Sequence, residues 1–486
     1  RETIRAGRRR AGCDVTPVVT ASPSRTSMTR QCVRLPHAGV FGVAFFLGIA
    51  CLTSGILGAQ QTTKRTLTSM DLRGAWKMGD GGIVALYPTD ASDTSWRFVD
   101  FESGASHRLY RRDSVTLTSS DGWTGATPTL NKYRVWLDSH GRARELTIAR
   151  KGARLRRGMR LALKEDTATF TSGGIKLFGK LTRPANGPRQ SPVVVFVHGS
   201  DNAASVDRTW DPYLFAANGV AMFVFDKRGT GRSGGEYLQM FSVLSDDVVA
   251  ATHWLRQRSD IDTSHIGVVG FSQGGWVAPL AASKDPGIRF MLVGYGMTMS
   301  VAEEDRMEAP LKLRERGFSE ADIREFEELN SAIHRAAERA FADGWGEIES
   351  KLTQYRDKPW MKALPDIPTW AGSVAQMGIE QAKVVVPNMF KTYIDPFYDS
   401  VPTLERLNIP ILWLIAGDDI EAPPGPTIAA LAKLRKNGKN IQTRIFPHTD
   451  HGITEFTLAG SRRTRTRYSP DYFPTMVSWV VKQTQQ

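Results

Sequence analysis

The stretch G-F-S-Q-G at residues 270–274 constrains the fold more than any other part of this chain. It follows an apolar run at 266–269 and opens a segment over 273–283 that reads as a helix. A G-x-S-x-G turn between a strand and a helix is typical of a nucleophile elbow. The glycines leave room for a sharp turn. Such a turn holds the Ser272 hydroxyl beside a helix N-terminus, where it suits attack on a carbonyl carbon.

Apolar runs alternate with helical segments from residue 168 onwards. The runs at 193–197 and 220–225 are continuously apolar, as expected for strands buried on both faces of a sheet. This alternation predicts an α/β fold with a mostly parallel sheet that helices cover on both faces. The other expected strands are 175–181, 266–269, 290–293, 411–415 and 441–446, and the expected helices are 206–217, 240–257, 273–283, 427–436 and 471–482.

Residues 300–400 interrupt this alternation with further helical segments. Ser319 and Asp322 have the spacing of a capping box. Apolar residues then repeat at helical intervals from Ile323 to Ala340. We expect a helical lid that shapes the acyl pocket and excludes water from it. The alternative is an insertion that only packs against the sheet.

Residues 68–165 alternate in a different way, with the period of strands. Tyr133 and Val135 are separated by polar residues, a turn follows, and Leu146 resumes the alternation. This pattern predicts a hairpin within a small all-β domain. The basic run at 150–157 is expected to be a solvated edge, because charge protects exposed strands from pairing.

The segment 1–59 differs in composition from the rest of the chain. Basic residues precede an apolar stretch at 38–57, and Ala59 offers a cleavage point. Together they predict an upstream segment followed by an export signal peptide. A lipoprotein site at Cys51 and an uncleaved anchor are the alternatives, the latter because the stretch approaches the ~20 residues that span a bilayer. All three place the body outside the cytoplasm, periplasmic or secreted, and the cleaved form has no membrane span.

Composition excludes several functional classes. All three cysteines precede residue 60, so the folded body has no disulfide and no cysteine nucleophile. The net charge is +13, but no segment interleaves arginines with aromatics, so we expect no nucleic-acid partner. We also expect no metal and no cofactor, since no His/Asp cluster has ligand spacing and no glycine loop has phosphate-binding spacing.

Acidic and histidine candidates follow the serine in the order Ser…Asp…His. Asp418 and Asp419 come directly after an expected strand, and His448 and His451 follow the next one. We favour Asp419 and His451 as the partners. In a triad of this order, His451 takes the Ser272 proton and later gives it to the leaving group, while Asp419 orients the imidazole and stabilises its cationic form.

Two backbone N–H groups are candidates for an oxyanion hole. Ser200 ends the segment V-H-G-S after the strand at 193–197, and Gln273 directly follows the serine of the elbow. Donors at these two places are aimed before the charge develops on a tetrahedral intermediate. We expect His198 to brace its loop rather than act as a base.

These residues together resemble those of the α/β-hydrolase superfamily over about 168–486. The match is closest to bacterial serine esterases and peptidase-like hydrolases with an N-terminal β extension. The segment D-K-R-G-T-G-R-S at 226–233 resembles the loop after the fourth strand of that family, where it braces the loops around the elbow. Substrate binding by Arg228 is the alternative. The resemblance implies an α/β-hydrolase domain at 166–486 and hydrolysis through an acyl-enzyme.

The expected reaction is hydrolysis of small-molecule carboxylic esters with small or medium acyl chains. A serine peptidase or amidase is the alternative, in which Glu303, Glu304 and Asp305 hold a free amine rather than form a solvated helix start. A thioesterase is a third possibility, whereas a non-enzymatic binding protein predicts a broken triad. The basic run at 462–467 is expected to be a solvated loop, with contact to anionic substrates or membranes as the alternative.

Overall fold

The computed structural model describes residues 72–485 except 91–94, 121 and 124–130. The predicted export signal, with Cys51 and Ala59, lies outside the described residues. The described residues belong to one compact unit of the chain, Lys64–Gln486. Within the described ranges, no helix has both the length and the apolar character needed to cross a membrane.

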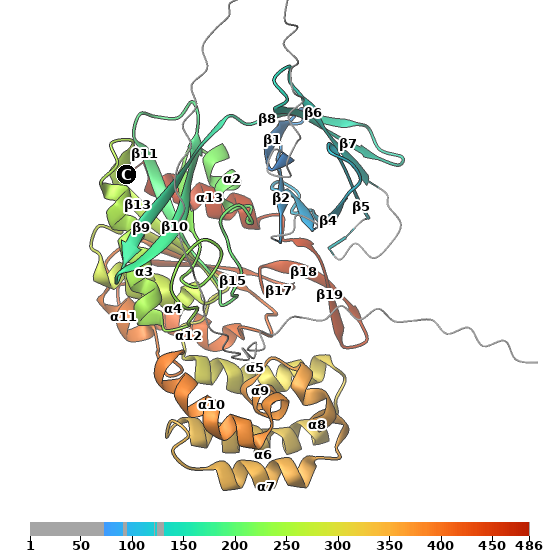
Figure 1. The fold of residues 1–486 in the computed structure, drawn as a ribbon, viewed down its shortest axis with the longest axis vertical. Coiled ribbons are helices and arrows are strands. Elements are labelled where there is room, and N and C mark those ends of the chain that lie inside the picture. The colour runs from blue at the N-terminus through green and yellow to red at the C-terminus, as the bar shows by residue number, and fades with distance from the viewer. Residues whose placement is uncertain (1–71, 91–94, 121, 124–130, 486) are drawn as a thin grey trace, which may run out of the picture. The chain divides into compact units, whose positions relative to one another are not determined.

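The first part of the described chain is a closed barrel of eight antiparallel strands (Figure 1). Large apolar side chains fill its interior, among them Trp76, Trp96 and Tyr133. The predicted hairpin is confirmed, because Tyr133 pairs with Ile148. The strands are β1 (Gly74–Met78), β2 (Ile83–Pro88), β3 (Trp96–Asp100), β4 (Ser106–Arg111), β5 (Thr116–Ser119), β6 (Asn131–Leu137), β7 (Ala143–Arg150) and β8 (Arg156–Arg160).

The prediction of a solvated edge at 150–157 is wrong in one respect. Most of these residues are exposed, but the strand that begins at Arg156 is not an edge. β8 pairs with β1, with Trp76 opposite Arg160, and this pairing closes the barrel. Closure removes the free edge that the charges were expected to protect.

An eight-stranded sheet follows the barrel and confirms the predicted α/β-hydrolase fold. Its strand order is β16-β15-β14-β13-β11-β12-β10-β9. The pairs β9–β10 and β10–β12 are antiparallel and the other pairs are parallel. The strands are β9 (Leu163–Ser172), β10 (Ile175–Pro184), β11 (Ser191–Val197), β12 (Ala221–Phe225), β13 (Ile261–Phe271), β14 (Phe290–Gly294), β15 (Ile411–Ala416) and β16 (Ile441–Phe446).

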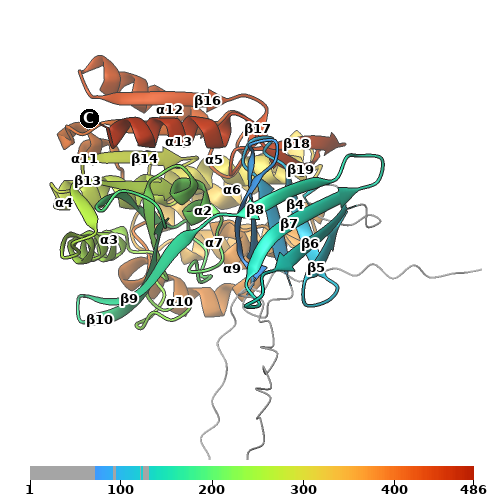
Figure 2. The same ribbon diagram turned by 90° about the horizontal axis from the view of Figure 1, so that it is seen from above.

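Helices cover both faces of this sheet (Figure 2). Residues of β11 alternate between two cores, since Val193 packs in one with α3, α4 and α12, whereas Val194 packs in the other with α2 and α13. The second core also takes in barrel residues, and Phe101 of the barrel contacts Phe473 with ring centroids 5.2 Å apart. These helices are α2 (Asp211–Ala217), α3 (Phe241–Arg256), α4 (Gly274–Lys284), α12 (Pro424–Lys436) and α13 (Tyr472–Gln483).

Helix α2 begins five residues later than the sequence pattern predicted. Pro212 stands in its first turn, where a missing N–H costs no hydrogen bond and the fixed φ suits a helix start. The preceding residues 206–210 form a turn and bends instead.

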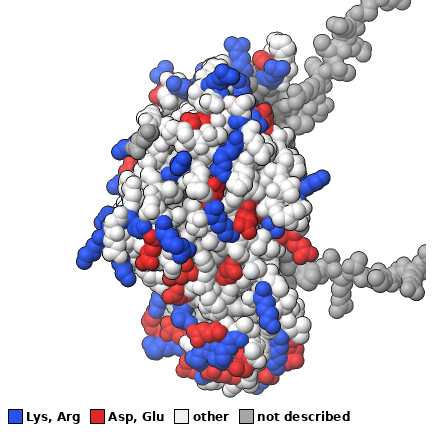
Figure 3. All heavy atoms as spheres, turned by 90° about the vertical axis from the view of Figure 1, so that its left-hand side faces the viewer, with Lys and Arg blue, Asp and Glu red and all other residues white. Residues whose placement is uncertain are grey.

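A helical insertion separates β14 from β15, as the sequence predicted. It has a core of its own, in which Phe326, Ile333 and Trp360 are fully buried. The predicted capping box is present, with Ser319 and Asp322 bonded reciprocally. Acidic and basic side chains are intermingled over this part of the surface (Figure 3). The helices are α5 (Val301–Glu315), α6 (Glu320–Ala337), α7 (Trp345–Tyr355), α8 (Pro359–Ala363), α9 (Trp370–Met377) and α10 (Ile379–Thr392); α11 (Val401–Arg406) then leads back to the sheet.

A small three-stranded sheet that the sequence did not predict lies between β16 and α13. It consists of β17 (Thr449–Asp450), β18 (Thr454–Ala459) and β19 (Arg462–Tyr468). The basic run 462–467 is therefore a strand, and the expectation of a solvated loop is wrong. Arg463 and Arg465 are half-buried, whereas Arg462 and Arg467 are exposed.

Candidate active site

Ser272 occupies the tip of a sharp turn between β13 and α4. Its φ is +52°, a conformation that a non-glycine residue adopts only where the surrounding structure enforces it. The turn favours glycine at position 270, because a Cβ there would lie 3.0 Å from the carbonyl oxygen of Gly274. The Ser272 N–H donates to the carbonyl of Gly294 at 3.0 Å. The turn is thus anchored to the neighbouring strand.

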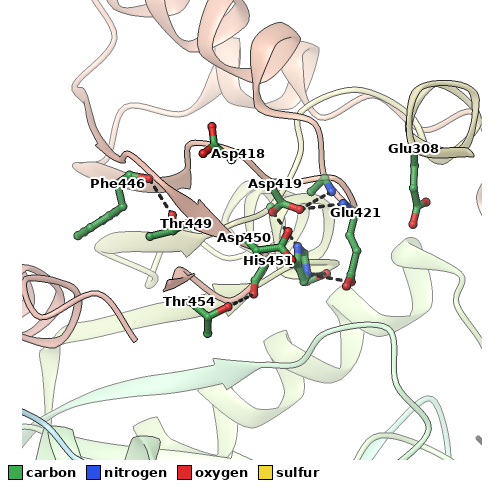
Figure 4. A network of polar contacts seen from close by, with 12 residues as sticks. Glu308, Asp418, Asp419, Glu421, Phe446, Thr449, Asp450, His451 and Thr454 are labelled. Carbon is green, nitrogen blue, oxygen red and sulfur yellow. Dashed lines mark hydrogen bonds and ion pairs between the residues drawn. The ribbon is translucent and has the colours of Figure 1, made fainter. Parts of the chain in front are cut away.

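The structure brings Ser272, His451 and Asp419 together in one chain of hydrogen bonds. His451 Nε2 lies 3.1 Å from Ser272 Oγ, and its Nδ1 lies 2.8 Å from Asp419 Oδ2. The second carboxylate oxygen of Asp419 accepts the N–H groups of Glu421 and Ala422, each at 2.9 Å (Figure 4). Asp419 is 4% exposed. A buried, oriented carboxylate behind an imidazole that contacts a serine is the geometry of an activated nucleophile.

The rival candidates lie elsewhere. Asp418 points away from His451 (Figure 4), and its carboxylate lies 3.5 Å from Nδ1 of His448. The side chain of His448 is 92% exposed. These two residues form a solvent-facing pair and do not reach Ser272.

The pKa of His451 is set by opposing effects. Burial lowers it, but the charge and hydrogen bond of Asp419 and the nearby carboxylate of Glu421 outweigh burial and raise the pKa to about 9. Glu421 Oε2 lies 3.9 Å from Nε2, the nitrogen that faces Ser272. Arg465 opposes this effect, and it forms an ion pair with Glu421 at 3.2 Å. The site therefore favours the cationic imidazole that forms during proton transfer.

The loop that carries Ser200 is braced by basic and aromatic side chains. Lys227 Nζ donates to the carbonyl of Gly199 at 2.7 Å and to that of Asp201, and the Tyr237 hydroxyl donates to the carbonyl of Ser200. A Cβ on Gly199 would lie 3.6 Å from that of Ser272. These contacts fix a stretch of backbone directly beside the candidate nucleophile.

His198 contacts a carbonyl rather than the candidate site. Its Nε2 bonds to the carbonyl oxygen of Phe225. Burial and the positive charge of Lys227 lower its pKa to about 3, so the ring is neutral at ordinary pH. This geometry is that of a residue that braces its loop.

The loop at 226–233 contributes structure around the elbow. One carboxylate oxygen of Asp226 accepts the N–H groups of Ser205 and Val206, each at 2.9 Å. Arg228 forms a bidentate pair with the buried Asp247, at 2.5 and 2.8 Å. The guanidinium of Arg228 is thereby engaged away from Ser272.

A cavity of about 470 Å³ opens in front of Ser272, and its lining is charged. One face of α5 supplies Glu304, Glu308, Lys312 and Glu315, at intervals of three and four residues that place side chains on the same side of a helix. Lys312 forms an ion pair with Glu308. This stripe was not predicted from the sequence, although the spacing of charges along 304–315 indicates it. The other lining residues are Ser200, Ser272, Arg316, Ile367, Pro368, Glu421 and His451.

The expectation of a solvated start for α5 is wrong for two of its three acidic residues. Glu303 is exposed and caps the helix together with Ser300. Glu304 lines the cavity, and burial raises its pKa to about 8 even though the charge of His451 opposes the shift. Asp305 is buried and accepts the Trp370 N–H at 2.7 Å.

Arg463 of β19 ties the loops of the candidate triad together. Arg463 donates to the carboxylate of Asp450 at 3.0 Å and to the carbonyl of Asp418. Its own N–H donates to Glu315, at the end of α5, at 3.3 Å. The strand thus connects the acid loop, the histidine loop and the helical insertion.

Within the described residues, no group of three His, Cys, Asp or Glu side chains is arranged to hold a metal ion.

The fold and the site define a hydrolase of the α/β-hydrolase superfamily. Residues 173–443 match the model of the X-Pro dipeptidyl-peptidase (S15) family, and the chain belongs to that family.

The chain is also similar to several known proteins. It is 32% identical over 125 residues to thiohydrolase AneE of Aspergillus aculeatus. The aligned residues make up 25% of this chain and 38% of that protein. It is 24% identical over 286 residues to the bifunctional esterase/perhydrolase DCH of Acinetobacter calcoaceticus. That alignment makes up 57% of this chain and 91% of the relative. Among solved structures, Est1E of Butyrivibrio proteoclasticus with bound ferulic acid aligns over 66% of this chain and all of its own, at 14% identity and a TM-score of 0.39.

Proposed function

We propose that the protein is an exported serine hydrolase that cleaves carboxylic esters through an acyl-enzyme. The observation that carries this proposal is the hydrogen-bonded chain from Ser272 through His451 to Asp419. Ser272 Oγ attacks the acyl carbon while His451 Nε2 takes its proton. The imidazolium then gives that proton to the leaving alcohol as the carbon–oxygen bond breaks. Water attacks the acyl-enzyme with His451 again as base, which releases the acid and restores Ser272.

The developing oxyanion needs donors that are already in place. We assign this role to the backbone N–H groups of Ser200 and Gln273. The braced backbone at Gly199 and the position of Gln273 directly after the nucleophile support the assignment. Fixed donors lower the barrier because they do not have to reorganise as charge develops.

The helical insertion acts as a lid in this proposal, with α5 facing the nucleophile. The charged stripe on α5 favours compact, polar acyl groups over long alkyl chains, because an alkyl chain would desolvate Glu304 and Lys312 without replacing their polar contacts. Export is proposed from the N-terminal sequence alone. Sequencing the N-terminus of the secreted protein tests it, with Gln60 expected as the first residue.

Hydrolysis of p-nitrophenyl acetate and butyrate tests the reaction. The wild type is expected to turn over the acetate faster than the butyrate, and Ser272→Ala to abolish turnover of both. Ser200→Ala is the matched control, because the proposed donor there is backbone rather than hydroxyl, and it is expected to retain activity. Ester turnover that persists in Ser272→Ala contradicts the proposal.

A peptidase of aminopeptidase type is the second candidate, and the acidic lining favours it. Glu421 faces the cavity beside Ser272, and its carboxylate would attract the protonated amine of a peptide. Peptidyl nitroanilides with free and with acetylated N-termini distinguish the two functions. Faster turnover of the free-amine peptide than of any ester would favour the peptidase. The similarity to a thiohydrolase supports a thioesterase as a third candidate, for which thioester substrates in the same assay are the test.

A further inference from the structure

The outer face of β6, β7 and β8 carries an unusual concentration of positive charge. Residues 131–160 contain ten lysines and arginines against two carboxylates, Asp138 and Glu145. The three strands lie side by side in the barrel (Figure 2). Within the described part of the chain, six of these cations are exposed and form no ion pair with a carboxylate: Lys132, Arg134, Arg142, Arg144, Lys151 and Arg154.

The same strands and the turns between them also expose apolar side chains. Of the large apolar residues that are exposed in the described ranges, half lie within 136–159: Trp136 at 44%, Leu137 at 36%, Leu155 at 44% and Met159 at 48%. Isolated exposed apolar residues are ordinary, but a group of them surrounded by charges marks an interaction surface.

The strand register places most of this group at one end of the face. Trp136 stands opposite Glu145, and Glu145 stands opposite Met159, so Trp136 and Met159 lie in one row across the three strands. The next row contains Arg134 and Arg157. Leu137 lies beside this row, at the end of β6. Apolar side chains are thus bordered by guanidinium groups.

Trp136 is held in a fixed position on this face. The Arg134 guanidinium lies 4.3 Å from the centre of its ring. Its Nε1 donates to the Thr147 hydroxyl at 3.2 Å. An indole with a polar edge that is already satisfied and an exposed apolar body is suited to a boundary between water and an apolar phase.

A cavity of about 630 Å³ opens at the same end of the face. Met159 lines it together with four arginines, Arg73, Arg142, Arg144 and Arg160, and two carboxylates, Asp138 and Glu165. Arg73 is already paired with Glu165 and Asp207. The other three guanidinium groups outnumber Asp138, and this excess suits an anionic group such as a phosphodiester.

We propose that this face of the barrel docks on a bilayer rich in anionic phospholipids. Its arginines and lysines contact the headgroup phosphates, and Trp136, Leu137 and Met159 enter the boundary between headgroups and acyl chains. A nucleic acid would satisfy the charges but not the aliphatic side chains, which offer no ring on which bases stack. This combination favours a lipid surface, and it assigns the barrel a role that is separate from ester hydrolysis.

Hydrogen exchange of the full chain localises the contact. With vesicles of phosphatidylcholine and phosphatidylglycerol at a ratio of about 7 to 3, we expect the turns at 138–142 and 151–155 to exchange more slowly. Vesicles of phosphatidylcholine alone should leave these turns unchanged, and so should the mixed vesicles in 0.5 M salt, because salt screens the attraction. Protection by a single-stranded oligonucleotide but not by vesicles would overturn the proposal, as would no protection by either.

Vesicle co-sedimentation measures the contribution of the side chains. Arg134→Gln, Arg142→Gln and Arg144→Gln combined should weaken partitioning at least about tenfold, since each cation near an anionic bilayer contributes several-fold. Trp136→Ser with Met159→Ser should also weaken it. The matched control is R324Q/K362Q/K391Q, which removes the same charge from exposed positions of the helical insertion and should change partitioning less than about twofold. Equal loss in the control would mean that only net charge matters, and would overturn the proposal. Unchanged hydrolysis of a soluble ester verifies that each variant folds.

Discussion

Replacing Glu421 by Gln should lower the pH at which the enzyme becomes active. His451 must be neutral to accept the Ser272 proton, so activity rises as pH passes the pKa of the imidazole, which the site raises to about 9. The Glu421 carboxylate lies 3.9 Å from Nε2 and stabilises the cation. Two unit charges at this separation interact by about 1 kcal/mol in water and about 4 kcal/mol at an effective dielectric constant of ~20.

The interaction energy lies in the lower half of this range, because the Glu421 side chain is 44% exposed and water screens its charge. An interaction of about 1–2 kcal/mol corresponds to roughly one pH unit. E421Q is therefore expected to move the acidic limb of the kcat/KM profile down by about one unit. The profile should be recorded with p-nitrophenyl acetate from pH 5 to 10, with subtraction of spontaneous hydrolysis.

Arg465→Gln is the matched control, because Arg465 lowers the pKa of His451. Its removal should shift the acidic limb upwards. Opposite shifts in the two variants would support the electrostatic account. Unchanged profiles in both variants, or shifts of the same sign, would refute it.

Three further predictions follow from the site. Asp419→Asn should lower kcat by about 10⁴-fold, whereas Asp418→Asn should stay within about twofold in the same ester assay; equal losses would show that the acid is misassigned. Glu304→Gln should raise Tm above pH 8 but not at pH 5. The pKa of Glu304 is about 8 in the folded state and about 4.5 in the unfolded state, so the unfolded state loses its proton first as the pH rises and the folded state loses stability between these values. A Tm change that does not depend on pH would contradict this. Arg463→Met should lower kcat about tenfold or more with little change in KM, since the contact with Asp450 is lost; an effect on KM alone would argue against a positioning role.

The central sheet was predictable because its signals are local. Each apolar run, such as 193–197, is long enough to identify a buried strand, and the elbow at 270–274 fixes the order of strand, turn and helix. The partners of Ser272 followed from their positions after successive strands, since the carboxyl ends of parallel strands meet at one edge of the sheet. Local sequence order is therefore enough to select these residues.

Long-range pairings could not be predicted in the same way. Closure of the barrel depends on the pairing of β1 with β8, and nothing local in either strand specifies the other. The strand at 462–467 could not be predicted because a run of arginines is typical of a solvated loop. Asp450 and Glu421, which stabilise these arginines, come close to them only in the folded chain. The partial burial of Glu304 likewise arises from its place in the cavity beside Ser272 and His451 rather than from its own sequence.

Covalent labelling with a fluorophosphonate tests the central claim most directly, because the reagent reacts only with a serine that a neighbouring base activates. Peptide mapping of the labelled wild type is expected to place the adduct on Ser272, and His451→Ala is expected to slow labelling by several orders of magnitude. An adduct on another serine, or undiminished labelling of Ser272 without the imidazole, would contradict the account.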